Sequence, residues 1–158
     1  MINIRNAEAE DVSTISNFLH LLAENDGHGD QCHITESEIH RYGFSPEKCF
    51  EIIILEVDGI PQGLALYFMT FSVWQASRIL FLSDLYVNAD CRGLGLGRTL
   101  FSTLAKIALK RECCRMDWQV LPEAEAAGFY RSLGAQKAED FHMYSLESDG
   151  LKELSKKA

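Results

Sequence analysis

The sequence has no apolar run long enough to span a membrane and no excess of basic charge. Its 158 residues carry 15 Lys and Arg against 23 Asp and Glu, a formal net charge of −8. We therefore expect no nucleic-acid partner, because neutralising phosphates requires a basic face. No stretch approaches the roughly 18 apolar residues of a membrane span. The first residues, Arg5 followed by acidic side chains, do not resemble a signal peptide, so we expect no membrane association.

The five cysteines form no CxxC pair and show no zinc-type spacing with histidine. Their odd number, without a secretion signal, is typical of reduced thiols in a cytoplasmic protein, and we expect no metal site. Cys113 and Cys114 are adjacent and have no evident histidine partner. We interpret them as buried side chains and not as nucleophiles, which favours direct group transfer over a covalent enzyme intermediate.

The chain also lacks internal repeats, low-complexity tracts and a Pro/Gly-rich linker. Its length is enough for one hydrophobic core without disulfides or metals. The apolar fraction of 47% and the charged fraction of 24% are ordinary for a globular protein. We expect residues 1–158 to form a single domain.

The first half of the sequence predicts a strand, two helices and a hairpin. Asp11 is placed to cap a helix with apolar residues at helical spacing, which ends between Asn25 and Gly29. Thr35 and Glu38 form a capping box for a second helix. Asp58-Gly59 is a strong hairpin signal. The strands are expected at residues 2–5, 50–57 and 62–71.

The second half predicts a strand–helix–strand unit and then another helix and strand. A β-rich run covers residues 78–87, and Gly134 stands where a left-handed helix C-cap is expected. The further elements are helices at residues 99–111 and 123–133, strands at 116–121 and 141–147, and a short helix in the tail from residue 151. This order indicates an α/β fold with an antiparallel front half.

Three glycines at alternate positions, Gly93, Gly95 and Gly97, follow a predicted strand and open a predicted helix. The amides at a helix N-terminus lack intrahelical acceptors and lie at the positive end of the dipole, so they stabilise an anion. Glycine lets the backbone approach a phosphate closely. Arg92 and Arg98 add positive charge on both sides of the cluster.

Two familiar phosphate-binding patterns do not fit this cluster. A P-loop requires Gly-Lys-Ser/Thr, which is absent. The dinucleotide pattern G-x-G-x-x-G fails because its last position falls on Arg98 or Leu100. What remains is Arg92-x-x-Gly95-x-Gly97, or the simpler alternative of a tight strand–helix connection that uses glycine for its geometry.

Arg-x-x-Gly-x-Gly after a β-rich strand resembles the acetyl-CoA signature of the GNAT superfamily of N-acetyltransferases. Four longer segments are similar to the diamine (spermidine/spermine) acetyltransferases, and the resemblance covers nearly the whole chain. They are residues 31–44, 68–74, 81–87 and 129–135. The resemblance implies a GNAT-type α/β fold, a mixed and mostly antiparallel sheet of six to seven strands flanked by helices.

The resemblance also implies how acetyl-CoA is held. The backbone of Leu85, Tyr86 and Val87 would contact the pantetheine arm, and an amide near Leu85 would polarise the thioester carbonyl as an oxyanion stabiliser. The pyrophosphate would lie on the glycine loop, whose residues are Arg92, Gly93, Leu94, Gly95, Leu96, Gly97 and Arg98.

Two residues take catalytic roles by resemblance. Tyr130 stands where the family places its general acid, since a phenol can donate a proton to the departing thiolate. Its alternative is a core tyrosine on an amphipathic helix. Asp84 would hold a cationic amine or help to remove its proton, although it could also be a strand-edge carboxylate. The family pattern here is Glu-Asp, and this chain has Ser83-Asp84, so the first carboxylate is missing.

Other acidic and aromatic residues are candidates for binding the acceptor. Asp26, with Glu24 and Asp30, could line an acidic mouth or form a solvated loop. His28 and His33 lie in the same segment, where either could titrate near neutral pH. Trp74 could flank the substrate entrance or have only a packing role. Ser83, next to Asp84, is a further candidate for contacting the substrate.

These residues together predict an acyltransferase. We expect acetyl transfer from acetyl-CoA to a primary amine of a small cationic metabolite, such as a diamine, polyamine or lysine-like amino acid. We also expect the enzyme to be a homodimer. The alternatives are acetylation of a protein amine, at an N-terminus or a lysine, and a catalytically silent acyl-CoA-binding module. The family usually carries Asn before the helix at 123–133, whereas this chain has Leu121-Pro122-Glu123-Ala124.

Overall fold

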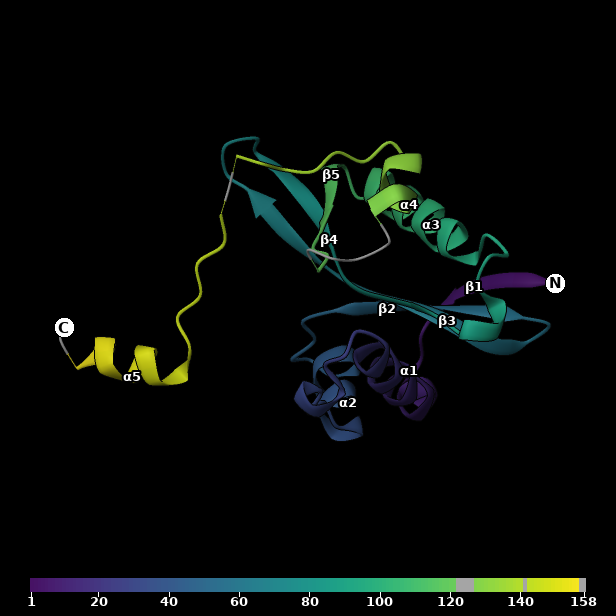
Figure 1. Cartoon of the computed structure of the whole chain (residues 1–158), viewed down its shortest axis with the longest axis horizontal. Coiled ribbons are helices and arrows are strands. Elements are labelled where there is room, and N and C mark those ends of the chain that lie inside the picture. The colour runs from purple at the N-terminus through teal and green to yellow at the C-terminus, as the bar shows by residue number, and fades with distance from the viewer. Residues whose placement is uncertain (122–126, 141, 157–158) are drawn as a thin grey trace. The chain divides into compact units, whose positions relative to one another are not determined.

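The computed structural model describes residues 1–121, 127–140 and 142–156. The chain divides after Leu121 into two units, Met1–Leu121 and Pro122–Ala158. The first unit contains the sheet and three of the helices (Figure 1). The second unit contains the short helices α4 (Ala127–Ser132) and α5 (Ser148–Ser155).

The first unit is built on one mixed sheet of five strands in the order β1-β2-β3-β4-β5. The first four strands pair antiparallel, and β5 runs parallel to β4. The strands are β1 (Ile2–Asn6), β2 (Glu51–Val57), β3 (Ile60–Ser72), β4 (Ser77–Val87) and β5 (Cys113–Trp118). The helices are α1 (Val12–Asn25), α2 (Glu36–Phe44) and α3 (Leu96–Lys110).

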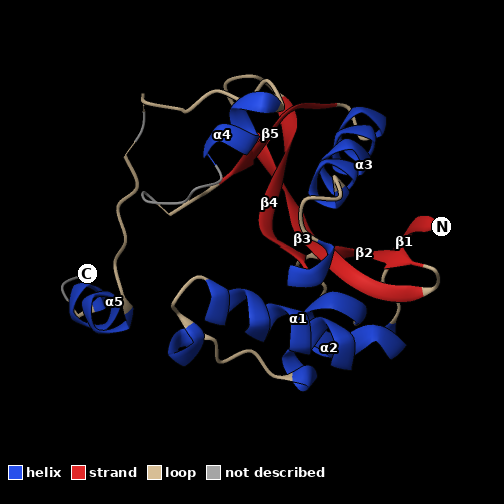
Figure 2. Ribbon diagram, turned by 45° about the vertical axis from the view of Figure 1, so that its right-hand side comes forward, coloured by secondary structure: helices blue, strands red, loops and turns tan. Residues whose placement is uncertain are grey.

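The two faces of the sheet are covered by different helices (Figure 2). Ile15, Phe18 and Leu19 of α1, with Ile39 of α2, pack on alternate strand residues that share one face. Those strand residues are Ile52, Ile54, Leu64, Leu66 and Tyr86. On the other side, α3 buries Leu100 and Leu104 beside β4 and β5. Two buried layers of side chains therefore enclose the sheet.

Several local predictions are confirmed by the structure. Asp58 and Gly59 both have positive φ, at 51° and 78°, as a tight hairpin between β2 and β3 requires. Thr35 accepts a hydrogen bond from the Glu38 amide, and the Glu38 side chain accepts one from the Thr35 amide, which completes the capping box of α2. Gly134 is left-handed, with φ of 85°, directly after α4 and Leu133.

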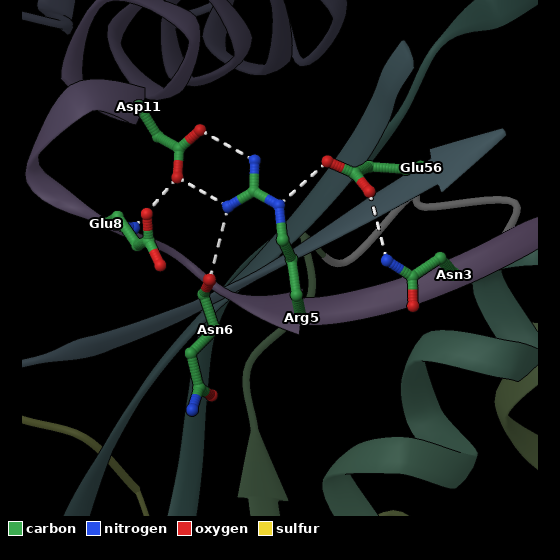
Figure 3. A network of polar contacts seen from close by, with 6 residues as sticks. All are labelled: Asn3, Arg5, Asn6, Glu8, Asp11 and Glu56. Carbon is green, nitrogen blue, oxygen red and sulfur yellow. Dashed lines mark hydrogen bonds and ion pairs between the residues drawn. The ribbon is translucent and has the colours of Figure 1, made fainter. Parts of the chain in front are cut away.

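Asp11 does not cap α1 through its side chain, as its position in the sequence predicts. Its carboxylate instead accepts two hydrogen bonds from the Arg5 guanidinium, at 2.7 and 2.8 Å, and a third from the Glu8 amide (Figure 3). Arg5 also donates through Nε to Glu56 at 2.7 Å. This network joins β1, the start of α1 and β2, and the nearby guanidinium outcompetes the helix amides for the carboxylate.

The expected six to seven strands are wrong, because the sheet contains five among the described residues. The predicted last strand at 141–147 begins at a residue outside the described part of the chain. Residues 142–147 have no strand conformation, and Met143 and Tyr144 are exposed. An apolar pattern makes a strand only where a neighbouring strand supplies hydrogen bonds, and no pairing is formed here by the described residues.

The strand predicted at 116–121 is also displaced, since β5 spans Cys113–Trp118. Its parallel pairing with β4, from Arg78 to Leu82, determines where it starts. Cys113 is half-buried, but Cys114 is exposed, which corrects the expectation that both are buried. Successive side chains of a strand point to opposite faces, so adjacent cysteines could not share one environment.

Candidate active site

β4 and β5 separate halfway along β4. Their last paired residues are Leu82 and Trp118, whereas β4 continues along β3 to Val87. From Ser83 to Val87, one edge of β4 therefore faces away from β3 without a strand partner in the described part of the chain. Leu85, Tyr86 and Val87, the residues expected to contact an acyl carrier through their backbone, lie on this stretch. The edge can pair with an extended ligand as a further strand would.

A glycine turn connects the open end of β4 to α3. Gly93 and Gly95 are left-handed, with φ of 77° and 78°, and a Cβ built on either would meet no atom within 4 Å. Gly95 is the N-cap of α3, so the first amides of the helix begin at Leu96 and have no acceptor inside the helix. The turn thus presents backbone donors beside open space, which fits a diphosphate.

The residues of the predicted anion loop differ in burial and in contacts. Leu96 is buried, so only its backbone is available to a ligand, whereas Leu94 is 69% exposed. Arg92 donates through Nε to the Val87 carbonyl at 3.3 Å, which ties the turn to the end of β4 and leaves its positive charge at the turn. Gly97 and Arg98 lie in the first turn of α3.

A β-bulge at Ser83 determines the direction of Asp84. Tyr67 of β3 pairs with Leu82, and the preceding residue, Leu66, pairs with Asp84, so Ser83 is the additional residue on β4. In a regular strand, Leu82 and Asp84 would share one face. The bulge places them on opposite faces, because paired residues of neighbouring strands share a face. Asp84 therefore lies on the same face as Leu66, which packs under α1 and α2.

A pocket of about 500 Å³ lies on this face. Its wall is largely apolar and carries two carboxylates, Asp26 and Asp84. The lining residues are Leu19, Leu22, Ala23, Asp26, His28, Cys32, Ile34, Phe50, Leu66, Ser83, Asp84 and Leu121. An apolar pocket with a few convergent acidic groups suits an aliphatic ligand that carries positive charge.

Burial raises the pKa of the Asp84 carboxyl above its usual value, and the nearby Asp26 carboxylate adds to the rise. Ser83 opposes it, since its hydroxyl donates a 2.6 Å hydrogen bond to Asp84 Oδ2. A cationic ligand beside Asp84 would counter this rise in pKa, because an opposite charge favours the ionised carboxylate. The two carboxylates in the wall therefore favour a ligand with positive charge.

The α1 C-terminus carries Asp26 to the pocket through a Schellman turn. The His28 amide donates to Ala23 O at 2.8 Å, and the Gly27 amide donates to Glu24 O at 3.0 Å. Gly27 has φ of 75°, a left-handed conformation that glycine adopts without steric cost. This reversal brings Asp26 and His28, from the end of α1, into the same pocket as Asp84 from β4.

The structure brings Asp26, Ser83 and Asp84 together in one pocket, but not every acceptor candidate. Trp74 lies in the turn between β3 and β4, is 91% exposed and does not line this pocket. Tyr130 lies on α4 in the second unit, and its role as general acid stays a prediction. Glu24 and Asp30 are exposed and are not lining residues of the pocket.

Sequence reasoning missed most of the apolar wall. Leu19, Leu22 and Ala23 could have been identified from helical spacing, since they follow Ile15 on the face of α1 that meets the sheet. Phe50 and Cys32 gave no such signal, because they reach the pocket through loops. Among the residues that the structure describes, no three His, Cys, Asp or Glu side chains form a metal-type cluster. In the same residues, no helix has the length and apolar character needed to traverse a lipid bilayer.

Known proteins resemble this chain in sequence and in fold. Residues 16–135 match the model of the Acetyltransferase (GNAT) family. The chain is 30% identical to a thialysine N-epsilon-acetyltransferase of Bos taurus, over 99% of this chain and 98% of the relative. It is 28% identical to the human spermidine/spermine N(1)-acetyltransferase-like protein 1, over 96% of this chain and 23% of that protein. Among solved structures, an integron cassette protein from the V. cholerae mobile metagenome superposes with a TM-score of 0.80 at 27% identity, covering 98% of both chains.

Proposed function

We propose a reaction for this chain on the premise that it belongs to the acetyltransferase (GNAT) family, whose members use acetyl-CoA as co-substrate. The chain transfers an acetyl group from acetyl-CoA to a primary amine of a small cationic metabolite. The observation that carries the substrate class is the apolar pocket with Asp26 and Asp84 in its wall. The names of the thialysine and spermidine/spermine relatives support the same class.

The acyl donor is held at the opened end of the sheet. The backbone edge from Ser83 to Val87 accepts the extended arm, and the turn from Arg92 to Arg98 accepts the pyrophosphate. This assignment is supported by the open space at Gly93 and Gly95, where a Cβ would meet no protein atom within 4 Å. The amide near Leu85 then polarises the thioester carbonyl.

The acceptor binds in the pocket on the face of the sheet that α1 covers. Asp84 lies on the stretch of β4 that has no β5 partner, and it pairs with the ammonium group that is to react. Asp26 pairs with a second positive charge of the same metabolite, and the apolar wall holds the aliphatic part between them. Tyr130 is the proton donor for the leaving thiolate.

The remaining proposals concern the whole protein. The chain is a cytoplasmic, single-domain enzyme that acts as a homodimer and needs neither metal nor nucleic acid. The net charge of −8 supports a cationic metabolite as the substrate, because an acidic protein attracts cations and repels nucleic acids.

An amine-panel assay tests the proposal. The full-length chain is incubated with acetyl-CoA and one acceptor at a time, and free thiol is measured. Thialysine, lysine, a short diamine and spermidine should be turned over, whereas a neutral amine of similar length should react slowly. Turnover with peptides alone would favour the alternative of a protein acetyltransferase. Binding of coenzyme A without turnover of any acceptor would favour a silent acyl-CoA-binding module.

A further inference from the structure

His28 lies in the pocket wall and is held rigidly for a loop residue. Its backbone amide donates the 2.8 Å hydrogen bond of the Schellman turn to Ala23 O. The ring nitrogen Nδ1 is 2.7 Å from the carbonyl oxygen of Asp26. Backbone and ring are thus both tied to the end of α1, so the imidazole has a defined direction although the residue is exposed.

The contact with Asp26 O also determines the tautomer of the ring. A carbonyl oxygen only accepts hydrogen bonds, so Nδ1 must carry the proton and donate it. In the neutral ring, Nε2 is then the nitrogen that has a lone pair and can accept a proton. His28 therefore has the form that a general base requires.

Ser83 and Asp84 lie in the same pocket wall as His28, and the Ser83 hydroxyl donates a hydrogen bond to the Asp84 carboxylate. Building on the proposed function, we propose that His28 is the general base that removes a proton from the ammonium group of the acceptor. Nε2 accepts one proton from R–NH₃⁺ and leaves R–NH₂. The nitrogen lone pair then forms a bond to the thioester carbon, the carbon–sulfur bond breaks, and the nitrogen loses a second proton. Coenzyme A thiolate takes up one proton to become the thiol, which balances the second proton lost by the nitrogen. The first proton, held by His28, is the net proton released to solvent.

Imidazole suits this step better than the carboxylates of the pocket. Histidine is the side chain that enzymes use most often as a general base, because its neutral ring keeps a lone pair on one nitrogen. The other titratable residues of the pocket wall are Asp26 from the end of α1, Asp84 from β4 and Cys32 from the segment after α1.

The variant His28→Asn separates the base from the structural role. The Asn amide nitrogen occupies nearly the place of Nδ1 and can still donate to Asp26 O, but nothing replaces Nε2. His33→Asn is the matched control, because His33 is an exposed histidine of the same loop region that does not line the pocket. Wild type and both variants are assayed from about pH 6 to about pH 10 with the best acceptor of the amine panel.

At about pH 7, His28→Asn should lower kcat by about 100-fold, the usual contribution of a general base, and leave the KM for acetyl-CoA unchanged. The deficit should shrink by about tenfold per pH unit towards the pKa of the amine, because the free amine then needs no base. Added imidazole should restore part of the rate in His28→Asn only, which a misfolded variant could not show.

Two failures of this experiment are distinguishable. If wild type turns over the amine and His28→Asn follows the same pH profile as His33→Asn, the role of His28 is refuted and the proposed function stands. If wild type turns over no amine at any pH, the proposed function fails and the role of His28 fails with it.

Discussion

The substitution Gly95→Ala, compared with Gly59→Ala, tests whether the turn before α3 holds the diphosphate of coenzyme A. The two glycines share a left-handed φ of 78°, and at both positions a Cβ would meet no atom within 4 Å. Gly59 lies in the β2–β3 hairpin, whereas Gly95 is the N-cap of α3. Both substitutions therefore impose the same backbone penalty, about 1–2 kcal/mol, without a clash inside the protein.

The effect on binding should differ between the two variants. At Gly95 the added methyl group would project into the space that the phosphate is expected to fill. Displacing the phosphate weakens at least one charge-assisted hydrogen bond, worth about 1.5–3 kcal/mol. Each 1.4 kcal/mol corresponds to a tenfold change in affinity, so Gly95→Ala should bind coenzyme A about 10- to 100-fold more weakly.

Calorimetry with coenzyme A gives the affinities, and urea titration gives the free energies of unfolding. Gly59→Ala should lose stability and keep wild-type affinity, whereas Gly95→Ala should lose both. If the two variants bind coenzyme A equally well, the turn does not contact the diphosphate, and the glycines serve only to join β4 to α3.

Three further substitutions test other parts of the structure. Asp11→Asn should lower the free energy of unfolding by about 2 kcal/mol at neutral pH in urea titrations, because the two-pronged pair with the largely covered Arg5 is lost. Pairing with Arg5 lowers the folded-state pKa of Asp11, so this stability is present above the unfolded pKa and is lost as the pH falls through the folded pKa; wild type and variant should converge in acid. Asp84→Asn should abolish turnover of cationic amines yet raise the melting temperature at neutral pH. Burial raises the folded-state pKa of Asp84, so wild type is penalised as the pH rises through that pKa, and the gain should vanish in acid. Tyr130→Phe should reduce kcat with unchanged affinity for coenzyme A in calorimetry, and an unaltered kcat would remove Tyr130 from the reaction.

The features predicted correctly from the sequence are those that neighbouring residues determine. The Asp58-Gly59 hairpin and the capping box of α2 each depend on side chains within three positions of each other. The strand–glycine–helix order around Gly95 is equally local, since a strand must end and a helix must begin within a few residues. Such signals do not require knowledge of the rest of the fold.

The features that the sequence did not predict depend on distant partners. Asp11 has good cap chemistry but lies within reach of Arg5, a competitor that only the packing of β1 against α1 provides. The bounds of β5 follow from its pairing with β4, more than 30 positions earlier in the chain. Residues 142–147 have an apolar pattern, but among the described residues nothing pairs with them.

The candidate site shows the same division. The sequence predicted that Asp26 and Asp84 bind an acceptor, and the two line one pocket although 58 positions separate them. It could not predict that a bulge at Ser83 turns Asp84 to the α1 face, because a bulge exists only relative to the register of β3. Nor could it predict the tautomer of His28, which depends on a carbonyl oxygen of the folded turn.

The parting of β4 from β5 has a consequence for the free protein. Backbone amides from Ser83 to Val87 that point away from β3 have no strand partner among the described residues. In deuterium exchange, those amides should exchange quickly in the free chain and slowly once the pantetheine chain completes the ladder. Saturating coenzyme A should also raise the melting temperature and slow proteolysis of the chain.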